Sequence, residues 1–501
     1  MNIALILEMA AGAEPDRVSL VCDGRRWTYG LLLTAARGAA ALIRSSGCGH
    51  VALLDESSEA AAIALFGAAL AGVPYVPLNY RLADPDLAAL LNRIAPALII
   101  GDVARVQRLC SDTANMPLLR HEFVTQAQAE AVHAPEEGDD GDDGEGIAIQ
   151  LFTSGTTAAP KAAILRHSNL LAYILGTVEF ASAAEADGAL VSVPPYHIAG
   201  ISALLSSIYA QRRIVMLPAF DPDAWLKLAE TEQVTNAFVV STMLSRIIEA
   251  KENGTVAKLS ALRAIAYGGG KMPLELIRKA LDHFPATDFT NAYGLTETSS
   301  TVALLGPEDH RRAHRSSDPI VARRLASVGK PLPSIELEIR DEGGRVLPVG
   351  EAGEIYVRGD QVSGEYQEKS ALDAQGWFPT RDAGYLDDQG YLFLSGRADD
   401  VIVRGGENIS PGEIEDVLLT HPAIADAVAV AIPSAEWGEA VGLAVVLRPG
   451  QAAPADAELQ QLIRTRLRSS RVPEKIVIVD ALPFNEMGKL LRRDVKQFFA
   501  D

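Results

Sequence analysis

Short apolar runs alternate with amphipathic segments through the middle of the chain. Runs with strand character lie at 189–194, 213–217, 236–240 and 263–267, and helical spacing occupies 222–231, 241–250 and 273–282. Such alternation is typical of crossover units on a parallel sheet. The same pattern occurs earlier in the chain, at 51–55, 58–71 and 97–101. It predicts a large α/β portion, for which two sheets are the simplest arrangement.

The hydrophobic pattern changes after Gly396. Helices are predicted at 410–422 and 455–470, and strands at 424–432, 442–447 and 475–480. Together they form a compact α+β unit of about 100 residues, with no long Pro- or Ser-rich linker before it. We therefore predict an α/β protein in which a large N-terminal domain, residues 1–397, is joined by a short hinge to a smaller α+β C-terminal domain, residues 400–501.

Length and charge agree with this division and exclude several classes of protein. At 501 residues the chain exceeds the ~250–300 residues at which a single core usually stops growing. Its net charge of -20 argues against a broad nucleic-acid surface. No uncharged stretch reaches the ~20 residues needed for a membrane span. The opening segment contains Glu8 and has no basic leader, so we expect no secretory signal.

Cysteine usage and one acidic run add two expectations. Cys22, Cys48 and Cys110 lie far apart and without CxxC spacing, so neither a zinc site nor a disulfide framework is predicted, and we expect a cytoplasmic protein. Residues 136–145 hold seven carboxylates and three glycines. A solvated loop is the simplest interpretation of this run, and a metal site is the alternative.

A Ser/Thr/Gly turn follows the apolar run that begins at residue 149. Its residues suited to phosphate are Thr153, Ser154, Gly155, Thr156, Thr157 and Lys161. Glycine permits close backbone approach, hydroxyl and N–H groups bind phosphate oxygens, and lysine supplies positive charge. The turn is not the G-x-x-x-x-G-K-[ST] loop, because its lysine follows a proline. By itself such a turn is more often an ordinary loop.

Two further motifs follow in order. AYGGGKMP, residues 266–273, ends an apolar run with three glycines, which would let a flat ligand lie against bare backbone. NAYGLTET, residues 291–298, contains Glu297, a carboxylate of the kind that holds Mg²⁺ together with phosphates. Taken alone, the first motif would be a tight turn and the second a helix cap.

The motifs between residues 149 and 492 together resemble those of the adenylate-forming superfamily, which includes acyl-CoA synthetases, peptide-synthetase adenylation domains and luciferases. Besides the motifs already quoted, the set includes GWFPTRDAGYLDDQGYLFLSGRADD at 376–400 and LPFNEMGKLLRR at 482–493. The resemblance implies an enzyme that uses ATP and Mg²⁺ to convert a small carboxylic acid into acyl-AMP with release of pyrophosphate. It also implies transfer of the acyl group to a thiol, most simply that of coenzyme A.

The resemblance assigns a nucleotide site. The Ser/Thr/Gly turn would bind the β- and γ-phosphates, and Tyr293 would stack on adenine. Thr296 would contact the α-phosphate, Glu297 would hold Mg²⁺, and Asp382 would bind the ribose hydroxyls. The other positions that it assigns to the nucleotide are Gly268, Gly269, Gly270, Asn291, Ala292, Gly294 and Arg397.

Catalytic and acyl-pocket residues are assigned in the same way. Lys489 would act in adenylation, because an ammonium near the carboxylate and α-phosphate stabilises crowded negative charge. His197 would gate the acyl pocket beside the substrate carboxylate. The catalytic set is then Lys489, Thr296 and His197, and the acyl pocket comprises His197, Ser241, Thr242, Gly270, Ala292 and Ser299. Small side chains in this pocket suggest room for a bulky or aromatic acid.

Movement of the C-terminal domain is also implied. Asp399 matches the hinge about which the family rotates this domain between the two half-reactions. The channel for the pantetheine arm would be lined by Gly405, Gly406, Glu407 and Trp437. Five nearby cations form either a site for the phosphates of coenzyme A or a solvated helix face: Arg464, Arg466, Arg468, Arg471 and Lys475. Ala158 and Arg381 stand where glycine is usual in the family.

Other functions stay open at this point. The main alternative is a stand-alone adenylation enzyme that loads a carrier protein or forms an amide from acyl-AMP. A scaffold that keeps the fold without catalysis is opposed by four intact positions, Glu297, Asp382, Arg397 and Lys489. The sequence identifies neither the acid nor the pathway, and it leaves a homodimer open.

Overall fold

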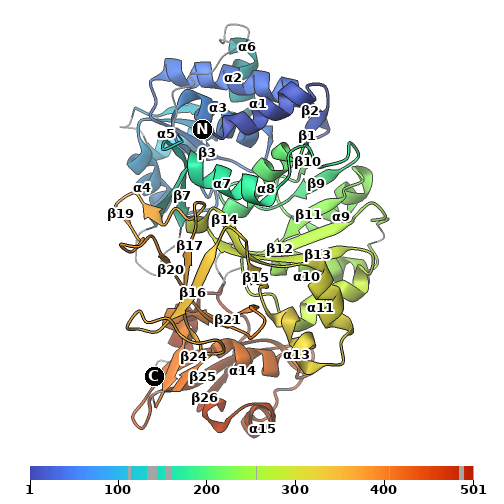
Figure 1. Cartoon of the computed structure of the whole chain (residues 1–501), viewed down its shortest axis with the longest axis vertical. Helices are drawn as coiled ribbons and strands as arrows, with labels where there is room; N and C mark the ends of the chain where they lie inside the picture. The colour runs from blue at the N-terminus through green and yellow to red at the C-terminus, as the bar shows by residue number, and fades with distance from the viewer. Residues whose placement is uncertain are drawn as a thin grey trace.

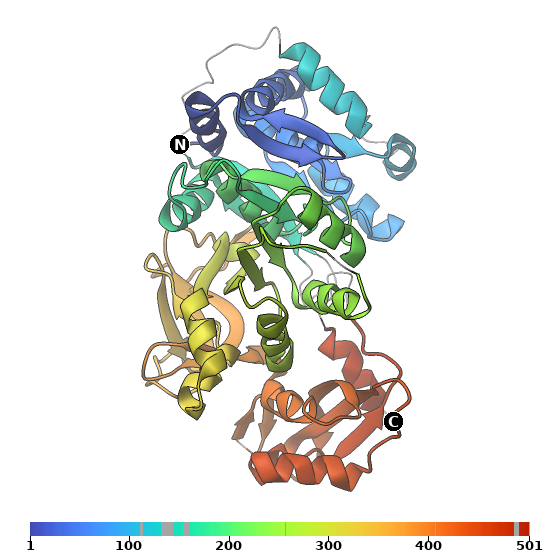
Figure 2. The ribbon, with the colours of Figure 1, turned by 90° about the vertical axis from the view of Figure 1, so that its right-hand side faces the viewer.

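The computed structural model describes residues 1–110, 114–131, 144–153, 160–255, 257–405, 407–484 and 490–499. Two sheets with their helices fill the upper part of Figure 1, and a smaller unit that contains the C-terminus lies at the lower end. The side view in Figure 2 shows this smaller unit as a separate body of strands and helices below the sheets. The chain therefore divides into a large and a small part.

The first sheet has nine strands, and its central strands are parallel. Their order is β15 (Lys330–Pro331), β14 (Ser300–Leu305), β13 (Asp288–Leu295), β12 (Ala264–Gly268), β11 (Asn236–Val239), β9 (Gly188–Val191), β10 (Arg213–Met216), β1 (Val18–Cys22) and β2 (Arg25–Thr28). Parallel neighbours need crossover connections. Four helices supply them after β9, β10, β11 and β12, namely α8 (Ile198–Tyr209), α9 (Pro222–Thr231), α10 (Ser241–Glu252) and α11 (Leu274–His283).

The second sheet has eight strands and the same character. Their order is β19 (Lys369–Ser370), β18 (Glu365–Tyr366), β8 (Lys161–Arg166), β7 (Ile147–Thr153), β4 (Tyr75–Pro77), β3 (His50–Leu54), β5 (Ala97–Gly101) and β6 (Met116–Leu118). Strands β7 to β6 are parallel, and β8, β18 and β19 extend the sheet in antiparallel fashion. The helices of this part are α4 (Asp84–Ile94), α5 (Val103–Leu109), α6 (Arg120–Glu130) and α7 (His167–Thr177).

Helices α1 (Ala4–Ala13), α2 (Tyr29–Ser46) and α3 (Glu59–Ala71) share one core with α8 and with strands of both sheets. Helix α2 begins after Thr28, whose Oγ1 accepts the N–H of Leu31 at 3.2 Å, and it ends at Gly47 in the left-handed region. Helix α3 is apolar all round, so it is buried on all sides. A Cβ on Gly67 would lie 2.7 Å from that of Ala39, so glycine lets α2 and α3 approach closely.

A third, antiparallel sheet comes next along the chain, before the small unit. It contains β16 (Glu336–Arg340), β17 (Gly353–Arg358), β20 (Phe378–Leu386) and β21 (Leu392–Arg397). Helices α12 (Pro307–Arg315) and α13 (Pro319–Ala322) and the 3₁₀ turn η2 (Arg323–Ala326) precede it. Strand β21 leads directly into the 3₁₀ turn η3 (Ala398–Asp400), after which the chain enters the small unit.

The small unit has its own sheet and its own core. Its strands are β23 (Glu407–Ile409), β22 (Ile402–Arg404), β25 (Gly438–Leu447) and β24 (Ile424–Ser434), with β26 (Lys475–Ile478) parallel to β25. Its helical segments are α14 (Pro411–Leu418), α15 (Asp456–Arg466), η4 (Ser469–Arg471), α16 (Arg492–Lys496) and η5 (Gln497–Phe499). Helices beside an antiparallel sheet make this an α+β unit.

The predicted fold class is confirmed, with differences in detail, among them a helix predicted at 410–422 that ends at Leu418. The helix predicted at 455–470 ends at Arg466, because Leu467 and Arg468 adopt extended backbone before a 3₁₀ turn. The third sheet was not predicted. Of the acidic run, residues 136–143 lie outside the described residues, so its two interpretations stay untested. None of the described helices is both long and apolar enough to cross a membrane.

A buried histidine in α12 makes the stability of the large part depend on pH. His310 is fully buried; its Nδ1 lies 2.8 Å from the Gly306 carbonyl and its Nε2 lies 2.8 Å from the Tyr267 hydroxyl. Because a carbonyl accepts only, Nδ1 carries the proton and Nε2 accepts from the tyrosine. Burial lowers the pKa of His310 to about 4.

This lowered pKa predicts acid destabilisation. Between pH 6.5 and 4 the unfolded chain binds a proton at this histidine that the folded chain excludes, so stability falls as pH falls. The expected loss across the window is about 3 kcal/mol. Urea unfolding of His310→Gln and the parent between pH 7 and 4.5 tests it, and the variant should show the flatter dependence. Identical slopes would contradict the assignment.

Candidate active site

A tyrosine, a carboxylate and an arginine meet where β13 faces the third sheet. The hydroxyl of Tyr293 donates to Oδ2 of Asp382 at 2.7 Å, and Nη1 of Arg397 lies 3.2 Å from Oδ1. Arg397 also donates to the Thr380 carbonyl at 3.2 Å. Burial and the nearby Asp382 carboxylate raise the pKa of Tyr293, so its hydroxyl remains protonated. Three residues predicted to bind the nucleoside are therefore brought together.

Glu297 is a buried carboxylate in the 3₁₀ turn η1 (Thr296–Thr298). Its Oε1 accepts the hydroxyl of Tyr366 at 2.7 Å, and its backbone carbonyl accepts the N–H groups of Ser363 and Gly364 at 2.9 and 3.1 Å. No cation among the described residues pairs with it. A buried carboxylate without a cation is costly, so this group is suited to bind a metal ion supplied from outside the chain.

The predicted phosphate turn joins β7 to β8. Thr153 and Lys161 face each other across this hairpin, and the Thr153 hydroxyl donates to the Lys161 carbonyl at 3.5 Å. Nζ of Lys161 lies 5.6 Å from the ring centroid of Tyr366, so the lysine and Glu297 contact the same tyrosine. The predicted residues Ser154, Gly155, Thr156 and Thr157, with Ala158, lie outside the described residues.

The glycines at the end of β12 form a smooth edge against β13. A Cβ on Gly268 would lie 2.2 Å from the carbonyl oxygen of Ala292, so any side chain would force the two strands apart. Gly269 has a φ of +76°, in the left-handed region, and a Cβ on Gly270 would meet open space. This bare backbone has the shape that a flat ring would need.

Other predicted nucleotide positions on β13 have structural contacts. The side chain of Asn291 donates to the Ser327 carbonyl at 3.3 Å. A Cβ on Gly294 would lie 1.7 Å from the Ser300 carbonyl oxygen, so glycine is required where β13 meets β14. The Thr296 carbonyl accepts the N–H of Ser299 at 3.1 Å and closes the η1 turn that contains Glu297.

The predicted acyl-pocket residues follow neighbouring parallel strands. His197 comes after β9, Ser241 and Thr242 after β11, and Gly270 after β12, and these strands are adjacent to one another and to β13. The carboxyl ends of parallel strands meet at one edge of the sheet, which is where α/β proteins bind ligands. The topology therefore brings these four residues to one edge, beside Ala292.

His197 is a neutral group at this edge. It precedes α8, it is partly buried, and its ring lies 4.8 Å from that of Tyr196. Burial lowers the pKa of His197 to about 4. At physiological pH the imidazole is therefore uncharged and can orient a carboxylate without forming an ion pair.

Two serines lie where η1 leads into β14. Ser299 is fully buried with a φ of +55°, and its Oγ has no partner among the described residues. Ser300, with a φ of +107°, places its Oγ 3.2 Å from that of Ser202 on α8. Non-glycine residues in the left-handed region store strain and often mark functional sites. The place of Ser299 in the acyl pocket stays a prediction.

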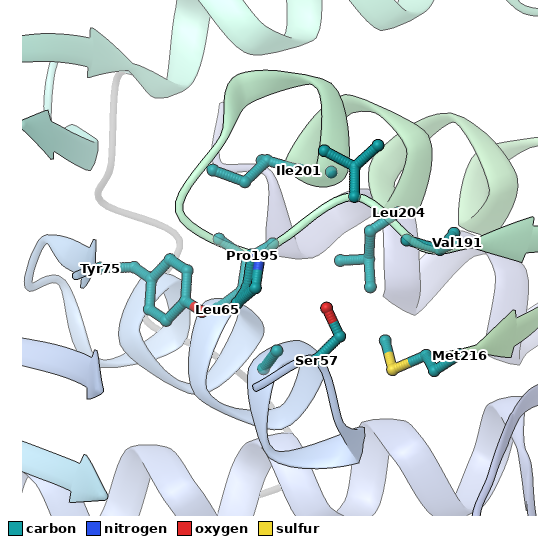
Figure 3. Close-up of a pocket in the computed structure, with 11 residues that line it drawn as sticks. Ser57, Leu65, Tyr75, Val191, Pro195, Ile201, Leu204 and Met216 are labelled. Carbon is teal, nitrogen blue, oxygen red and sulfur yellow. The ribbon is translucent and has the colours of Figure 1, made fainter. Parts of the chain in front are cut away.

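A separate apolar cavity lies on another face of α8 and was not predicted. It is lined by Ser57, Ala61, Leu65, Tyr75, Val191, Val193, Pro195, Gly200, Ile201, Leu204 and Met216. Figure 3 shows these residues converging from α3, β4, α8 and the ends of β9 and β10. The buried hydroxyl of Tyr75 has no partner among the described residues. The cavity contains none of the predicted site residues.

In the small unit, two of the residues predicted to line the thiol channel are in contact. The N–H of Gly405 donates to the Trp437 carbonyl at 3.0 Å, and a Cβ on Gly405 would lie 2.8 Å from the indole ring. Glu407 pairs with Arg471 and, at 3.8 Å, with Arg468, and Arg471 holds the pKa of Glu407 below its usual value. Gly406 lies outside the described residues.

The five cations noted in the sequence do not form one free patch. Arg471 also pairs with Glu413 at 2.8 Å, and Arg466 donates to the Thr420 hydroxyl at 2.8 Å. Arg464, Arg468 and Lys475 are also exposed. These three cations are therefore the stronger candidates for contact with an anionic ligand.

The structure describes the predicted hinge residue only in part and does not describe the predicted catalytic lysine. The backbone of Asp399 lies in η3, between β21 and the small unit. Lys489 lies outside the described residues, and the residues on either side of its segment, Phe484 and Leu490, form a β-bridge. Arg381 has a φ of +61°, as the glycine usual at this position would permit, and its exposed side chain lies 3.7 Å from Glu354.

Two family models match this chain. The AMP-binding enzyme model matches residues 7–367, and the AMP-binding enzyme C-terminal domain model matches residues 413–489. The chain belongs to the AMP-binding enzyme family. This confirms the predicted adenylate-forming superfamily and, with the relatives below, an enzyme of the acid–thiol ligase class.

Relatives of full length agree with this membership. An indoleacetate–CoA ligase of Aromatoleum aromaticum is 30% identical over 100% of this chain and 98% of its own length. A feruloyl-CoA synthase of an Amycolatopsis species is 32% identical over 98% and 97%. A fatty acid–[acyl-carrier-protein] ligase of Streptomyces coeruleorubidus is 31% identical over 97% and 94%.

Solved structures of the family have the same fold. o-Succinylbenzoate CoA synthetase of Bacillus subtilis, in complex with its acyl-adenylate intermediate, has a TM-score of 0.83 and 28% identity and covers 98% of this chain and 97% of its own. The amide bond synthetase McbA of Marinactinospora thermotolerans has a TM-score of 0.85 and 26% identity over 100% of both chains. The first has also been solved with ATP and a magnesium ion. These relatives confirm the predicted family cofactors ATP, Mg²⁺ and coenzyme A.

Two residues at or beside the site of this AMP-binding enzyme were missed by the sequence analysis. Tyr366 donates to the Glu297 carboxylate and lies against Lys161, but it comes from the two-residue strand β18, which carries no motif. Lys271 directly follows the glycine edge and pairs with carboxylates of the small unit. The sequence offered one signal, because Lys271 is a cation directly after the three glycines. Its partners could not be predicted, because they lie more than a hundred residues further along the chain.

Proposed function

We propose that this enzyme joins a carboxylic acid to coenzyme A in two half-reactions. The acid first attacks the α-phosphorus of ATP, giving acyl-AMP and pyrophosphate. The thiol of coenzyme A then attacks the acyl carbon and releases AMP. The observation that carries the proposal is Glu297, a buried carboxylate that pairs with no cation among the described residues and accepts the hydroxyl of the tyrosine that also lies against Lys161. The full-length CoA ligase relatives support the same proposal.

In the first half-reaction two anions must meet. Bound Mg²⁺ would neutralise phosphate charge, and Glu297 is the residue that would hold it. Lys161 would add positive charge at the phosphates, with the turn that follows Thr153, and Lys489 would supply an ammonium beside the reacting carboxylate. Asp382, oriented by Tyr293 and Arg397, would bind the ribose hydroxyls and fix the nucleotide for in-line attack.

In the second half-reaction the thiol needs positioning rather than a protein nucleophile. We propose that residues 400–501 rotate about Asp399 against residues 1–397 and bring Gly405, Gly406, Glu407 and Trp437 to the acyl-AMP. The contact of Gly405 with Trp437 and the exposure of Arg468 support a channel for a slim arm with a phosphorylated end. The three cysteines are buried and none forms a disulfide, in accord with the cytoplasmic location that we propose.

A carrier protein or an amine is the alternative acceptor. The acyl-carrier-protein ligase and the amide bond synthetase among the relatives favour keeping this candidate. The test is a pyrophosphate-release screen of aliphatic, aromatic and polycyclic acids, followed by mass spectrometry with coenzyme A, holo-carrier protein or simple amines. A CoA thioester is expected. An acid that gives acyl-AMP and then only carrier thioester or amide would overturn the CoA assignment.

Replacing Tyr366 tests how Glu297 is oriented. Tyr366→Phe keeps the ring beside Lys161 and removes the donor to the carboxylate. Groups that orient a metal ligand are worth about 10–100-fold in metal affinity, so we expect the Mg²⁺ concentration for half-maximal pyrophosphate release to rise about tenfold. Tyr391→Phe is the control, since Tyr391 donates to Asp309 at the same 2.7 Å. Equal Mg²⁺ curves for both variants would contradict this role.

A further inference from the structure

One lysine of the large part reaches into the small unit. Lys271 lies between the Gly268–Gly270 edge and the start of α11. Its Nζ is 2.8 Å from Oδ1 of Asp416 and 3.5 Å from Oε2 of Glu415, and it donates to the Gly412 carbonyl at 3.2 Å. Within the described residues, these are the only ion pairs that join the chain before η3 to the chain after it.

Glu415 continues the contact into the interior of the small unit. Only 4% of this residue is exposed, yet its Oε1 lies 2.6 Å from Nη1 of Arg492 and accepts the N–H of Ala429 at 3.1 Å. Arg492 and Lys271 therefore approach one buried carboxylate from two sides. Arg492 and Lys271 hold the pKa of Glu415 below its usual value against the effect of burial.

The same arginine reaches the turn between the two parts. Nε of Arg492 lies 3.6 Å from Oδ2 of Asp400, which is the residue next to the proposed hinge. A line of alternating charge thus runs from Lys271 through Glu415 and Arg492 to Asp400. Arg492 is also the first residue of α16 and follows Lys489 by only three positions. This line of charges therefore links the glycine edge of the nucleotide site to two segments that the proposed mechanism uses. One is the turn that contains the proposed hinge, and the other is the start of α16, which follows Lys489 in the sequence.

We propose that Lys271 is a positioning residue for acid activation, holding the small unit in the orientation that serves acyl-AMP formation until the unit rotates. This inference rests on the proposed function. It is supported by the position of Arg492, which contacts the same Glu415 carboxylate as Lys271 in the orientation that the structure shows. Glu407, by contrast, is paired within the small unit by Arg471 and Arg468 and contributes no ion pair to the large part among the described residues.

We call the contact of Lys271 with Asp416 and Glu415 the latch. It is weak enough to break and re-form in every turnover. Side chains of Lys271 and Asp416 are 48% and 41% exposed, and ion pairs at such exposure are weak. A weak pair shifts the balance between two orientations by a small factor without trapping either one. Glycine at position 412 leaves room for the lysine, since a Cβ there would lie 3.1 Å from Nζ.

Single-turnover measurements of the two half-reactions test the latch. In Lys271→Met we expect acyl-AMP formation to slow about fivefold, while thioester formation from supplied acyl-AMP is unchanged or faster. Lys279→Met is the matched control, because Lys279 pairs with Glu252 at 2.8 Å inside the large part and should affect neither rate. Lys271→Arg, which keeps the positive charge beside Asp416 and Glu415, should keep acyl-AMP formation near the parental rate. Equal slowing of both half-reactions in Lys271→Met, or the same slowing of acyl-AMP formation in Lys271→Arg, would overturn the proposal.

A distance measurement tests the latch independently of the proposed enzyme activity. Spin labels on Glu308→Cys and Gln461→Cys report the separation of the two parts, and both positions are exposed while the native cysteines are buried. Lys271→Met should broaden the distance distribution of the ATP-free protein, and Lys279→Met should leave it unchanged. Broadening without acyl-AMP formation in the parent would retain the latch and reject the activity. Unchanged distances in Lys271→Met would reject the latch, whatever the activity.

Discussion

Lys489→Ala should lose acyl-AMP formation while keeping most of its thioester formation. The ammonium would stabilise negative charge that develops between the carboxylate and the α-phosphate, and a neutral side chain cannot replace it. Loss of one such preorganised group lowers a rate by about 10²–10³-fold. Pyrophosphate release from ATP and acid measures the first half-reaction, and acyl-CoA formed from supplied acyl-AMP measures the second.

The control for this variant is Lys496→Ala, which removes an exposed lysine from α16 in the same unit. It should leave both half-reactions at the parental rate. If Lys489→Ala slowed the two half-reactions by the same factor, the division of labour between the two orientations of the small unit would be wrong.

Glu297→Gln should abolish the response of the enzyme to Mg²⁺. The amide oxygen still accepts the Tyr366 hydroxyl, so the turn keeps its shape, but the negative charge that would hold the metal is gone. We expect pyrophosphate release to fall by about 100-fold or more at any Mg²⁺ concentration. The measurement is initial rate against Mg²⁺ at saturating ATP.

Asp360→Asn serves as the matched carboxylate control, because Asp360 is exposed and lies in the connection between β17 and β18. Its Mg²⁺ dependence should equal that of the parent. A Glu297→Gln enzyme that recovers the parental rate when Mg²⁺ is raised, or that never loses it, would contradict the role given to this carboxylate.

Much of the fold could be predicted because local patterns matched the final structure. The strands β9 to β12 and the helices between them follow from period and length, and their parallel order follows from the crossovers. The third sheet was missed, since its four antiparallel strands are partly exposed and alternate weakly, as the burial of Glu336–Arg340 illustrates. Such strands are stabilised by pairing with distant neighbours rather than by their own sequence.

The site, like the fold, could be predicted only in part from the sequence. Tyr293, Asp382 and Arg397 could be predicted to meet because each lies in a motif, and the structure brings them within hydrogen-bond distance. Tyr366 and Lys271 could not, because their contacts depend on tertiary packing between elements far apart in the sequence. Their roles follow only from the partners that they reach, the carboxylates of Glu297 and Asp416.

The most direct test of the central claim is exchange of labelled pyrophosphate into ATP in the presence of a panel of carboxylic acids. The account predicts exchange that requires both an acid and Mg²⁺, needs no coenzyme A, and is lost in Glu297→Gln. A folded protein that binds ATP but exchanges no pyrophosphate with any acid, or that exchanges it equally well without an acid, would contradict the account.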